Sequence, residues 1–156
     1  MATKRILFIG APFGQFFREL AEALEQQGAE VYRVVLDGGD WAETPARNRI
    51  PLNRSMSWAR FLRDVIATRG IQTIVTYNDT LPRNRIALTI AKRLGLTRLV
   101  LENGYLRPHH VTLAQNGVNG NSELSCDPAV ISKASNSVHT NTTGSTCWRR
   151  KPCRST

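Results

Sequence analysis

Near its amino terminus the chain reads Arg5-Ile6-Leu7-Phe8-Ile9-Gly10-Ala11-Pro12-Phe13-Gly14, an apolar run that leads into a turn bounded by two glycines. A continuous apolar run of this length is typical of a strand that is buried on both faces of a parallel sheet. After the turn, apolar residues recur at helical spacing, and the pattern closes at Gly28, where a helix C-cap belongs. The opening of the chain therefore predicts a central strand, a loop and a helix.

The same alternation of strand and helix continues along the chain. Strands are predicted over 30–36, 71–77 and 98–101, from runs rich in β-branched residues. Ser57 is the predicted N-cap of a helix that closes at Gly70, and a further helix closes at Gly95. The predicted buried stripes of these two helices are Trp58, Phe61, Leu62, Val65 and Ile66 in the first and Ile86, Ala87, Ile90, Ala91 and Leu94 in the second.

Two stretches do not follow the alternation. The polar stretch from Trp41 to Met56 has no clear periodicity and is long for a loop inside a compact domain, which favours a functional or mobile segment; we assign it no secondary structure. Val111-Thr112-Leu113 is a candidate short extended segment. Repeated strand–helix units indicate a right-handed, doubly wound parallel sheet. The predicted fold class is α/β, with one Rossmann-like domain over residues 1–125.

The composition changes in residues 126–156. Ser, Thr and Asn dominate there, and the apolar spacing disappears. All three cysteines lie in this part, without the paired spacing of a zinc site or a disulfide framework. We expect a disordered tail whose sequence resembles the product of a shifted reading frame.

The formal charge of +9 is unevenly distributed, because the tail carries five Lys or Arg against the single acid Asp127. A basic surplus attracts phosphate groups, acidic lipid headgroups or nucleic acid, or is simply solvated, and charge alone does not choose among these. No apolar segment approaches the roughly 18 residues of a membrane span, and the amino terminus lacks a signal-peptide pattern. A cytoplasmic location is therefore expected.

Ligands of open α/β sheets gather at the carboxyl ends of the strands, so three loops are candidates for one shared cleft. The loop from Gly10 to Gly14 precedes a helix, whose free N–H groups suit an anion; the alternative is a tight strand-to-helix turn. The loop after 71–77 offers Asn78, Asp79, Arg83 and Arg85 to a sugar hydroxyl or a carboxylate. The alternative there is helix capping by Asp79 or Thr80, with solvated arginines.

The third loop carries the densest group of polar side chains. Glu102, Gly104, Tyr105 and Arg107 lie within six residues and could hold a charged sugar, or the loop could merely turn and pack Tyr105 and Leu106 on the domain. His109 and His110 are adjacent, so they point apart in an extended segment and cannot jointly bind a metal. One of them is a candidate general base; the alternative is a pair of surface histidines.

Four segments together resemble the KpsS/LipB branch of the capsule polysaccharide biosynthesis family, over about Met1 to Val130. They are Leu7-Phe8-Ile9-Gly10-Ala11-Pro12-Phe13-Gly14-Gln15-Phe16-Phe17, Asp37-Gly38-Gly39-Asp40, Glu102-Asn103-Gly104-Tyr105-Leu106-Arg107-Pro108 and Gly117-Val118-Asn119-Gly120-Asn121-Ser122.

The resemblance implies a retaining β-Kdo glycosyltransferase that acts at the inner face of the bacterial inner membrane. It implies CMP-Kdo as donor, a phosphatidylglycerol-type lipid as acceptor, and contact with the membrane and with other capsule-assembly proteins. We expect no cofactor, and no metal because the cysteines and histidines lack the spacing of a metal site. It also implies a GT-B-like pair of Rossmann-like domains, of which the donor-binding second domain lies outside this chain. The chain alone is therefore expected to be inactive.

The resemblance also implies the residues of the cleft. The catalytic candidates are Glu102, Asn103 and Arg107, although Asn103 stands where many relatives have an acid, and an amide cannot act as an anionic nucleophile. The candidates for substrate binding are Gly10, Gly14, Asp79, Arg83, Gly104, Tyr105 and His109.

Other functions remain open from the residues alone. A non-catalytic binding module of flavodoxin-like shape fits the strand–helix pattern, whereas a response regulator would need an acidic cluster where Gly10 stands. Nucleic-acid binding would use the basic surface, but no aromatic-interleaved motif or recognition helix accompanies it. We therefore expect no nucleic-acid partner.

Overall fold

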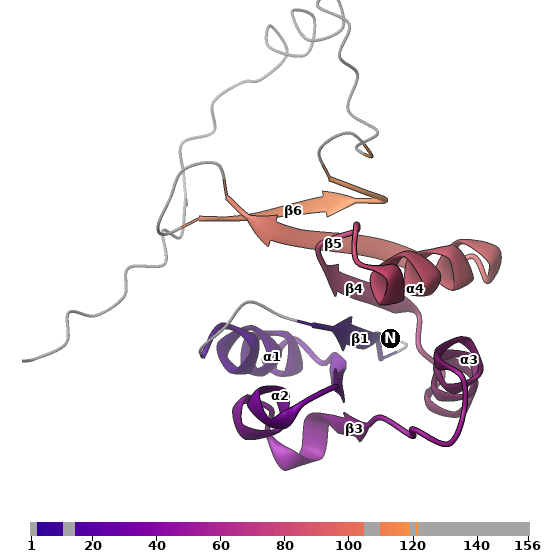
Figure 1. Ribbon diagram of the computed structural model, residues 1–156. Helices are drawn as coiled ribbons and strands as arrows, with labels where there is room; N and C mark the ends of the chain where they lie inside the picture. Colours follow the sequence, from indigo (N-terminus) through magenta and orange to yellow (C-terminus); the bar gives the residue numbers. More distant parts are fainter. Residues whose placement is uncertain (1–2, 11–14, 105–109, 119–120, 122–156) are drawn as a thin grey trace, which may run out of the picture.

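The computed structural model describes residues 3–10, 15–104, 110–118 and 121, which form a six-stranded sheet flanked by helices (Figure 1). The strands are β1 (Arg5–Ile9), β2 (Glu30–Val35), β3 (Arg49–Pro51), β4 (Thr73–Tyr77), β5 (Thr97–Asn103) and β6 (Val111–Gln115). The helices are α1 (Phe16–Gln26), α2 (Gly38–Glu43), α3 (Trp58–Arg69) and α4 (Pro82–Arg93), with a 3₁₀ turn, η1, at Ala46–Asn48.

The strand order is β3-β2-β1-β4-β5-β6, with β1 at the point where the winding reverses. Side chains of β1 alternate between the two faces of the sheet. Leu7 and Ile9 pack in one core with α3 and α4, whereas Ile6 and Phe8 pack in another with α1. The doubly wound α/β prediction is confirmed, and the apolar run of β1 is explained by burial on both sides.

The sheet is mixed, because β6 runs antiparallel to β5 while the other four pairings are parallel. A parallel return needs a crossover of a dozen or more residues. Only the short segment between Asn103 and Val111 connects these two strands, so an antiparallel hairpin is the geometry that it can reach. The candidate segment at 111–113 is thus a strand, and it extends to Gln115.

The stretch from Trp41 to Met56, to which the sequence assigns no secondary structure, contains regular elements. The last residues of α2, the turn η1 and the edge strand β3 all lie within this stretch. Helix α2 begins with two glycines and buries none of its residues, and β3 buries only Ile50. Neither element therefore leaves a periodic apolar signal, and Pro51 is tolerated because β3 lies at the sheet edge.

The buried stripe predicted for α4 is also wrong in part. Ala87, Ile90 and Ala91 are buried, but Ile86 is 41% and Leu94 51% exposed. Leu88 and the polar Asn84 take their places in the interior. The helix lies with its small alanines against the sheet, which leaves Ile86 on the side toward α3.

The predicted helix C-termini at glycines are confirmed, whereas the predicted side-chain cap at the start of α3 is not formed. Gly70 ends α3 in the left-handed conformation, at φ 60°, where an added side chain would be strained. Ser57 occupies the N-cap position of α3 as predicted, but its side chain makes no capping hydrogen bond.

A buried ion pair joins β2 to α2. The Arg33 side chain is 2% exposed; it bonds to Asp40, lies 3.7 Å from a Glu43 oxygen, and stacks at 5.0 Å over the Phe17 ring. Asp40 also accepts a hydrogen bond from the Leu36 amide at 2.9 Å. The Asp37-Gly38-Gly39-Asp40 segment therefore has a structural role. Asp37 caps the amino end of α2, and Asp40 neutralises the charge of Arg33.

We expect Asp40→Ala to lower the free energy of unfolding by about 3 kcal/mol, because it leaves a buried guanidinium with only Glu43 nearby. Urea denaturation followed by circular dichroism measures the loss. Asp64→Asn, at an exposed acid of α3, is the control and should change stability by less than about 0.5 kcal/mol. Equal stability of the two variants would contradict a neutralising role for Asp40.

Helix α1 is linked to η1 by the carboxylate of Glu25, which bonds to Arg47 and Asn48. Partial burial acts to raise the pKa of this carboxyl, but hydrogen bonds from Arg47 and Asn48 and the positive charge of Arg47 outweigh it and lower the pKa below its usual value. The Glu25 oxygens lie 2.9 Å from Arg47 Nη2 and 2.6 Å from Asn48 Nδ2.

A lowered carboxyl pKa contributes stability that is present above the unfolded-state pKa and is lost as the pH falls through the folded-state pKa. We expect Glu25→Gln to flatten the fall in unfolding free energy between about pH 5 and about pH 3. The effect should stay below about 1 kcal/mol, because Arg47 is 59% exposed. The Glu30 pKa is also lowered, by hydrogen bonds from Tyr32 and Arg5, so part of the slope should remain. An unchanged slope would exclude the Glu25 bridge as its source.

Candidate functional site

The carboxyl ends of β1, β4 and β5 lie side by side, because β4 pairs with both neighbours. Gly10 follows β1 with φ +71°, and a Cβ atom added to it would lie 3.6 Å from Cβ of Tyr77 at the end of β4. The left-handed backbone, rather than lack of space, is the reason for a glycine here. This brings the predicted binding residue Gly10 to the tip of β4.

Tyr77 in turn contacts the end of β5. Its hydroxyl donates a hydrogen bond of 2.9 Å to Oδ1 of Asn103, and both side chains lie on the α1 face of the sheet by strand alternation. Because the amide oxygen of this exposed Asn103 accepts that bond, its amide N–H groups are the part suited to a ligand's acceptor atoms. Sequence reasoning missed Tyr77, although it ends an apolar strand and faces the candidate loop residues.

The loop after β4 is held by the backbone and by its own polar side chains. Asn84, buried in the first turn of α4, donates to the carbonyl oxygens of Tyr77 and Asn78 at 2.7 and 2.8 Å. Asn78 has φ 72° and accepts two hydrogen bonds of 2.6 Å from Thr80. The N-cap of α4 is Leu81, so the capping alternative for Asp79 or Thr80 is wrong.

Asp79 is buried, at 5% exposure, and connects two distant parts of the chain. Its Oδ2 atom accepts hydrogen bonds of 3.1 Å from the Val118 amide and from Nδ2 of Asn121. Val118 packs against Leu88 and Val100 on the α4 face of the sheet. Asp79 thus fixes the segment after β6 to the loop after β4, and its direct contact with a substrate stays a prediction.

The hairpin of β5 and β6 brings the third candidate loop to the same edge. Gly104 donates to the His110 carbonyl at 2.8 Å, and an added Cβ would lie only 2.6 Å from that oxygen, so this position requires glycine. Glu102 pairs with Thr112, and strand alternation directs its side chain to the face opposite Asn103. The predicted residues Gly14, Tyr105, Arg107 and His109 lie outside the described residues.

A pocket of about 350 Å³ lies at the carboxyl ends of β2 and β3. Its cations are Arg54 and Arg83, and Met56 and Trp58 supply an apolar wall. Trp58 donates from Nε1 to the Arg83 carbonyl at 2.9 Å, which ties the start of α3 to the start of α4. The remaining lining residues are Leu36, Leu52 and Asn53.

The lining of this pocket is mainly polar, and its two arginines suit an anionic group. Arg83 therefore lies among the loops after β2 and β3, rather than acting only with the loop after β4. Sequence reasoning missed Arg54, which lies in a stretch without clear periodicity. Trp58, predicted for the buried stripe of α3, packs against the core and also lines this pocket.

Neither a metal cluster nor a membrane span is found in the parts that the structure describes. No group of three or more His, Cys, Asp or Glu side chains there is close enough to hold a metal ion. No helix within the same ranges is both long and apolar enough to cross a bilayer.

Comparison with known proteins gives consistent matches. The chain is 33% identical over 129 residues to the capsule polysaccharide export protein KpsS of Escherichia coli. It is 32% identical over 126 residues to the capsule polysaccharide modification protein LipB of Neisseria meningitidis. These matches cover 82% and 79% of this chain but only 33% and 30% of the relatives, so the chain spans about a third of their length.

A family model described as capsule polysaccharide biosynthesis protein matches residues 72–150, about half of the chain. The matched range holds β4, α4, β5 and β6 and extends past Val130, and the predicted origin of the tail stays a prediction. The chain belongs to the capsule polysaccharide biosynthesis protein family, and the resemblance to KpsS and LipB is confirmed.

Proposed function

We propose that this chain supplies the first α/β domain of a capsule-polysaccharide sugar transferase, with the carboxyl edge of its sheet as one wall of the transfer cleft. The observation that carries the proposal is the meeting of separate family-like segments at that edge. Gly10 lies next to Tyr77, whose hydroxyl donates a hydrogen bond to Asn103. Asp79 accepts hydrogen bonds from Val118 and Asn121. Ligands of open α/β sheets bind at such edges.

The proposed reaction is transfer of Kdo from CMP-Kdo to a phosphatidylglycerol-type lipid, as an early step of capsule polysaccharide synthesis and export. We propose that the reaction takes place at the cytoplasmic face of the inner membrane, next to other capsule-assembly proteins. This part of the proposal rests on the family resemblance. A second domain, GT-B-like in its arrangement with the first, would bind most of the donor.

Sugar transfer needs a site that stabilises an oxocarbenium-like transition state and the charge on the departing phosphate. Asn103 is suited to donate hydrogen bonds from its amide, because its oxygen already accepts from Tyr77. Glu102, one residue earlier on β5, is the carboxylate that we assign to the anomeric carbon or to a proton-transfer step. This assignment rests on the family resemblance, because the Glu102 side chain lies on the face of the sheet opposite Asn103.

The pocket at β2 and β3 supports a place for the acceptor. Its two arginines suit a phosphoryl group, and Trp58 and Met56 suit the apolar part of a lipid. The pocket and the Gly10–Tyr77–Asn103 contact lie along the same edge of one sheet, on either side of the end of β1.

We expect the chain alone to form no product from CMP-Kdo and lysophosphatidylglycerol. A chimera that joins residues 1–121 to the remaining part of the Escherichia coli relative should form it, as measured by mass spectrometry of the lipid. Product from the chain alone would contradict the assignment of the donor site to a second domain.

In that chimera, Glu102→Gln should lower the transfer rate by at least about 100-fold if Glu102 acts in proton transfer or as a nucleophile. Glu22→Gln, at an exposed acid of α1, is the matched control and should leave the rate unchanged. An active Glu102→Gln chimera would remove this role from Glu102 while leaving the proposed transfer intact.

A further inference from the structure

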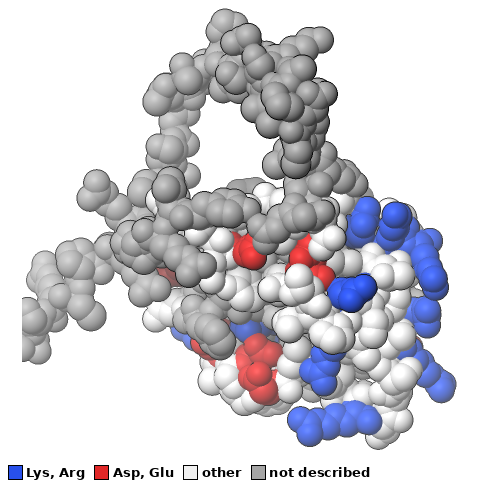
Figure 2. Space-filling model, turned by 45° about the horizontal axis from the view of Figure 1, so that its top comes forward, with Lys and Arg blue, Asp and Glu red and all other residues white. Residues whose placement is uncertain are grey.

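Helices α3 and α4 form a strongly basic face on one side of the sheet. The two helices carry seven basic residues and a single acidic one, Asp64. The basic residues are Arg60, Arg63 and Arg69 on α3 and Arg83, Arg85, Lys92 and Arg93 on α4. Figure 2 shows Lys and Arg side chains gathered along the side of the molecule where these helices lie. We call this surface the α3–α4 basic face.

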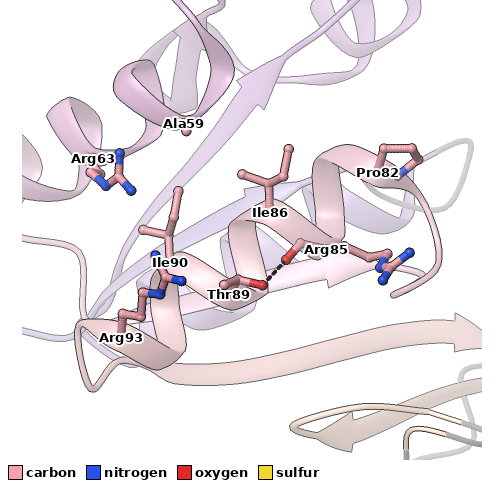
Figure 3. A pocket seen from close by; sticks show the side chains of 8 residues that line it. All are labelled: Ala59, Arg63, Pro82, Arg85, Ile86, Thr89, Ile90 and Arg93. Carbon is pink, nitrogen blue, oxygen red and sulfur yellow. Dashed lines mark hydrogen bonds between the residues drawn. The ribbon is translucent and has the colours of Figure 1, made fainter.

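An apolar groove of about 430 Å³ runs through this face between the two helices. Ile86 and Ile90 point from α4 toward Ala59 of α3, with Arg63 and Arg93 at one end of the groove (Figure 3). Arg85 and Pro82 lie at the other end. The groove is thus an apolar floor with a rim of arginines.

The rim is not neutralised within the part of the chain that the structure describes. The ion pairs found there involve Arg5, Arg33 and Arg47, all of which lie outside α3 and α4. Side chains of Arg63, Arg85 and Arg93 are exposed, and Ile86 is 41% exposed between them. Concentrated positive charge beside an open apolar surface suits a partner that is both anionic and apolar at its boundary.

We propose that the α3–α4 basic face docks on an anionic phospholipid bilayer. Arg63, Arg85 and Arg93 contact headgroup phosphates, and Ile86 reaches the boundary between headgroups and acyl chains. A bilayer presents many phosphates above apolar chains and needs no matching shape. A single-stranded nucleic acid would instead call for aromatic platforms, and the groove lining contains none.

Docking in this orientation brings the sheet edge close to the lipid. Both helices begin at the carboxyl edge, where Trp58 and Arg83 line the pocket described above. The inference rests on the proposed function for the membrane contact itself and adds the surface that makes it. Vesicle binding is measured without sugar transfer, so failure of the docking and failure of the transfer are distinguishable.

The test is co-sedimentation of the purified chain with vesicles of phosphatidylglycerol and phosphatidylcholine, beside vesicles of phosphatidylcholine alone. We expect binding to the anionic vesicles only, and release as the salt concentration rises. Arg63→Gln with Arg93→Gln should lower the partition coefficient on the order of 30-fold, from the contribution of two cations at the membrane surface. Ile86→Ser keeps the charge and should lower binding by several-fold, on the order of the transfer free energy of one apolar side chain.

The charge-matched control is Lys4→Gln with Arg18→Gln, which removes two exposed cations away from the two helices, and it should retain most of the binding. Circular dichroism establishes that both double variants are folded. Failure of the unmodified chain to bind anionic vesicles at low salt would overturn the proposal, as would equal losses in the two double variants. Retention on double-stranded DNA without retention on vesicles would assign the face to nucleic acid and also overturn it.

Discussion

The pairing of β1 with β2 on one side and β4 on the other is the constraint on which the rest of the fold depends. It places one apolar strand between two helix layers, so Leu7 and Phe8 face different cores although they are neighbours in sequence. It also places the carboxyl ends of β1 and β4 side by side, and Gly10 lies next to Tyr77 at this point. The candidate site therefore follows from the winding order before any polar side chain is considered.

Elements that bury a repeated apolar face could be predicted from the sequence, and those that do not were missed. The strands β1, β2, β4 and β5 are short runs with strong β propensity, and the glycines at 28, 70 and 95 mark helix ends through positive φ. Helix α2 and strand β3 have almost no buried apolar side chain to signal them. Arg33 was missed for the opposite reason, because a charged residue within a strand is buried only when distant acids pair with it.

The location of the candidate site could be predicted from the sequence, whereas several of its contacts could not. Its location could be predicted, because the carboxyl ends of parallel strands converge whatever residues they carry. The contacts of Asp79 could not, since its partners Val118 and Asn121 are about forty residues away and the capping alternative was locally satisfactory. Tyr77 contributes one hydroxyl hydrogen bond to Asn103, and Asn84 bonds to backbone carbonyl oxygens. No rule of residue spacing identifies such contacts in a sequence.

The hydrogen bonds of Asp79 have a consequence for two segments of the chain at once. They hold residues 118 and 121 against the loop after β4, at the carboxyl edge of the sheet. Loss of this one carboxylate would therefore release the loop after β4 and the segment after β6 from each other. A single side chain thus couples the positions of two segments that are about forty residues apart in the sequence.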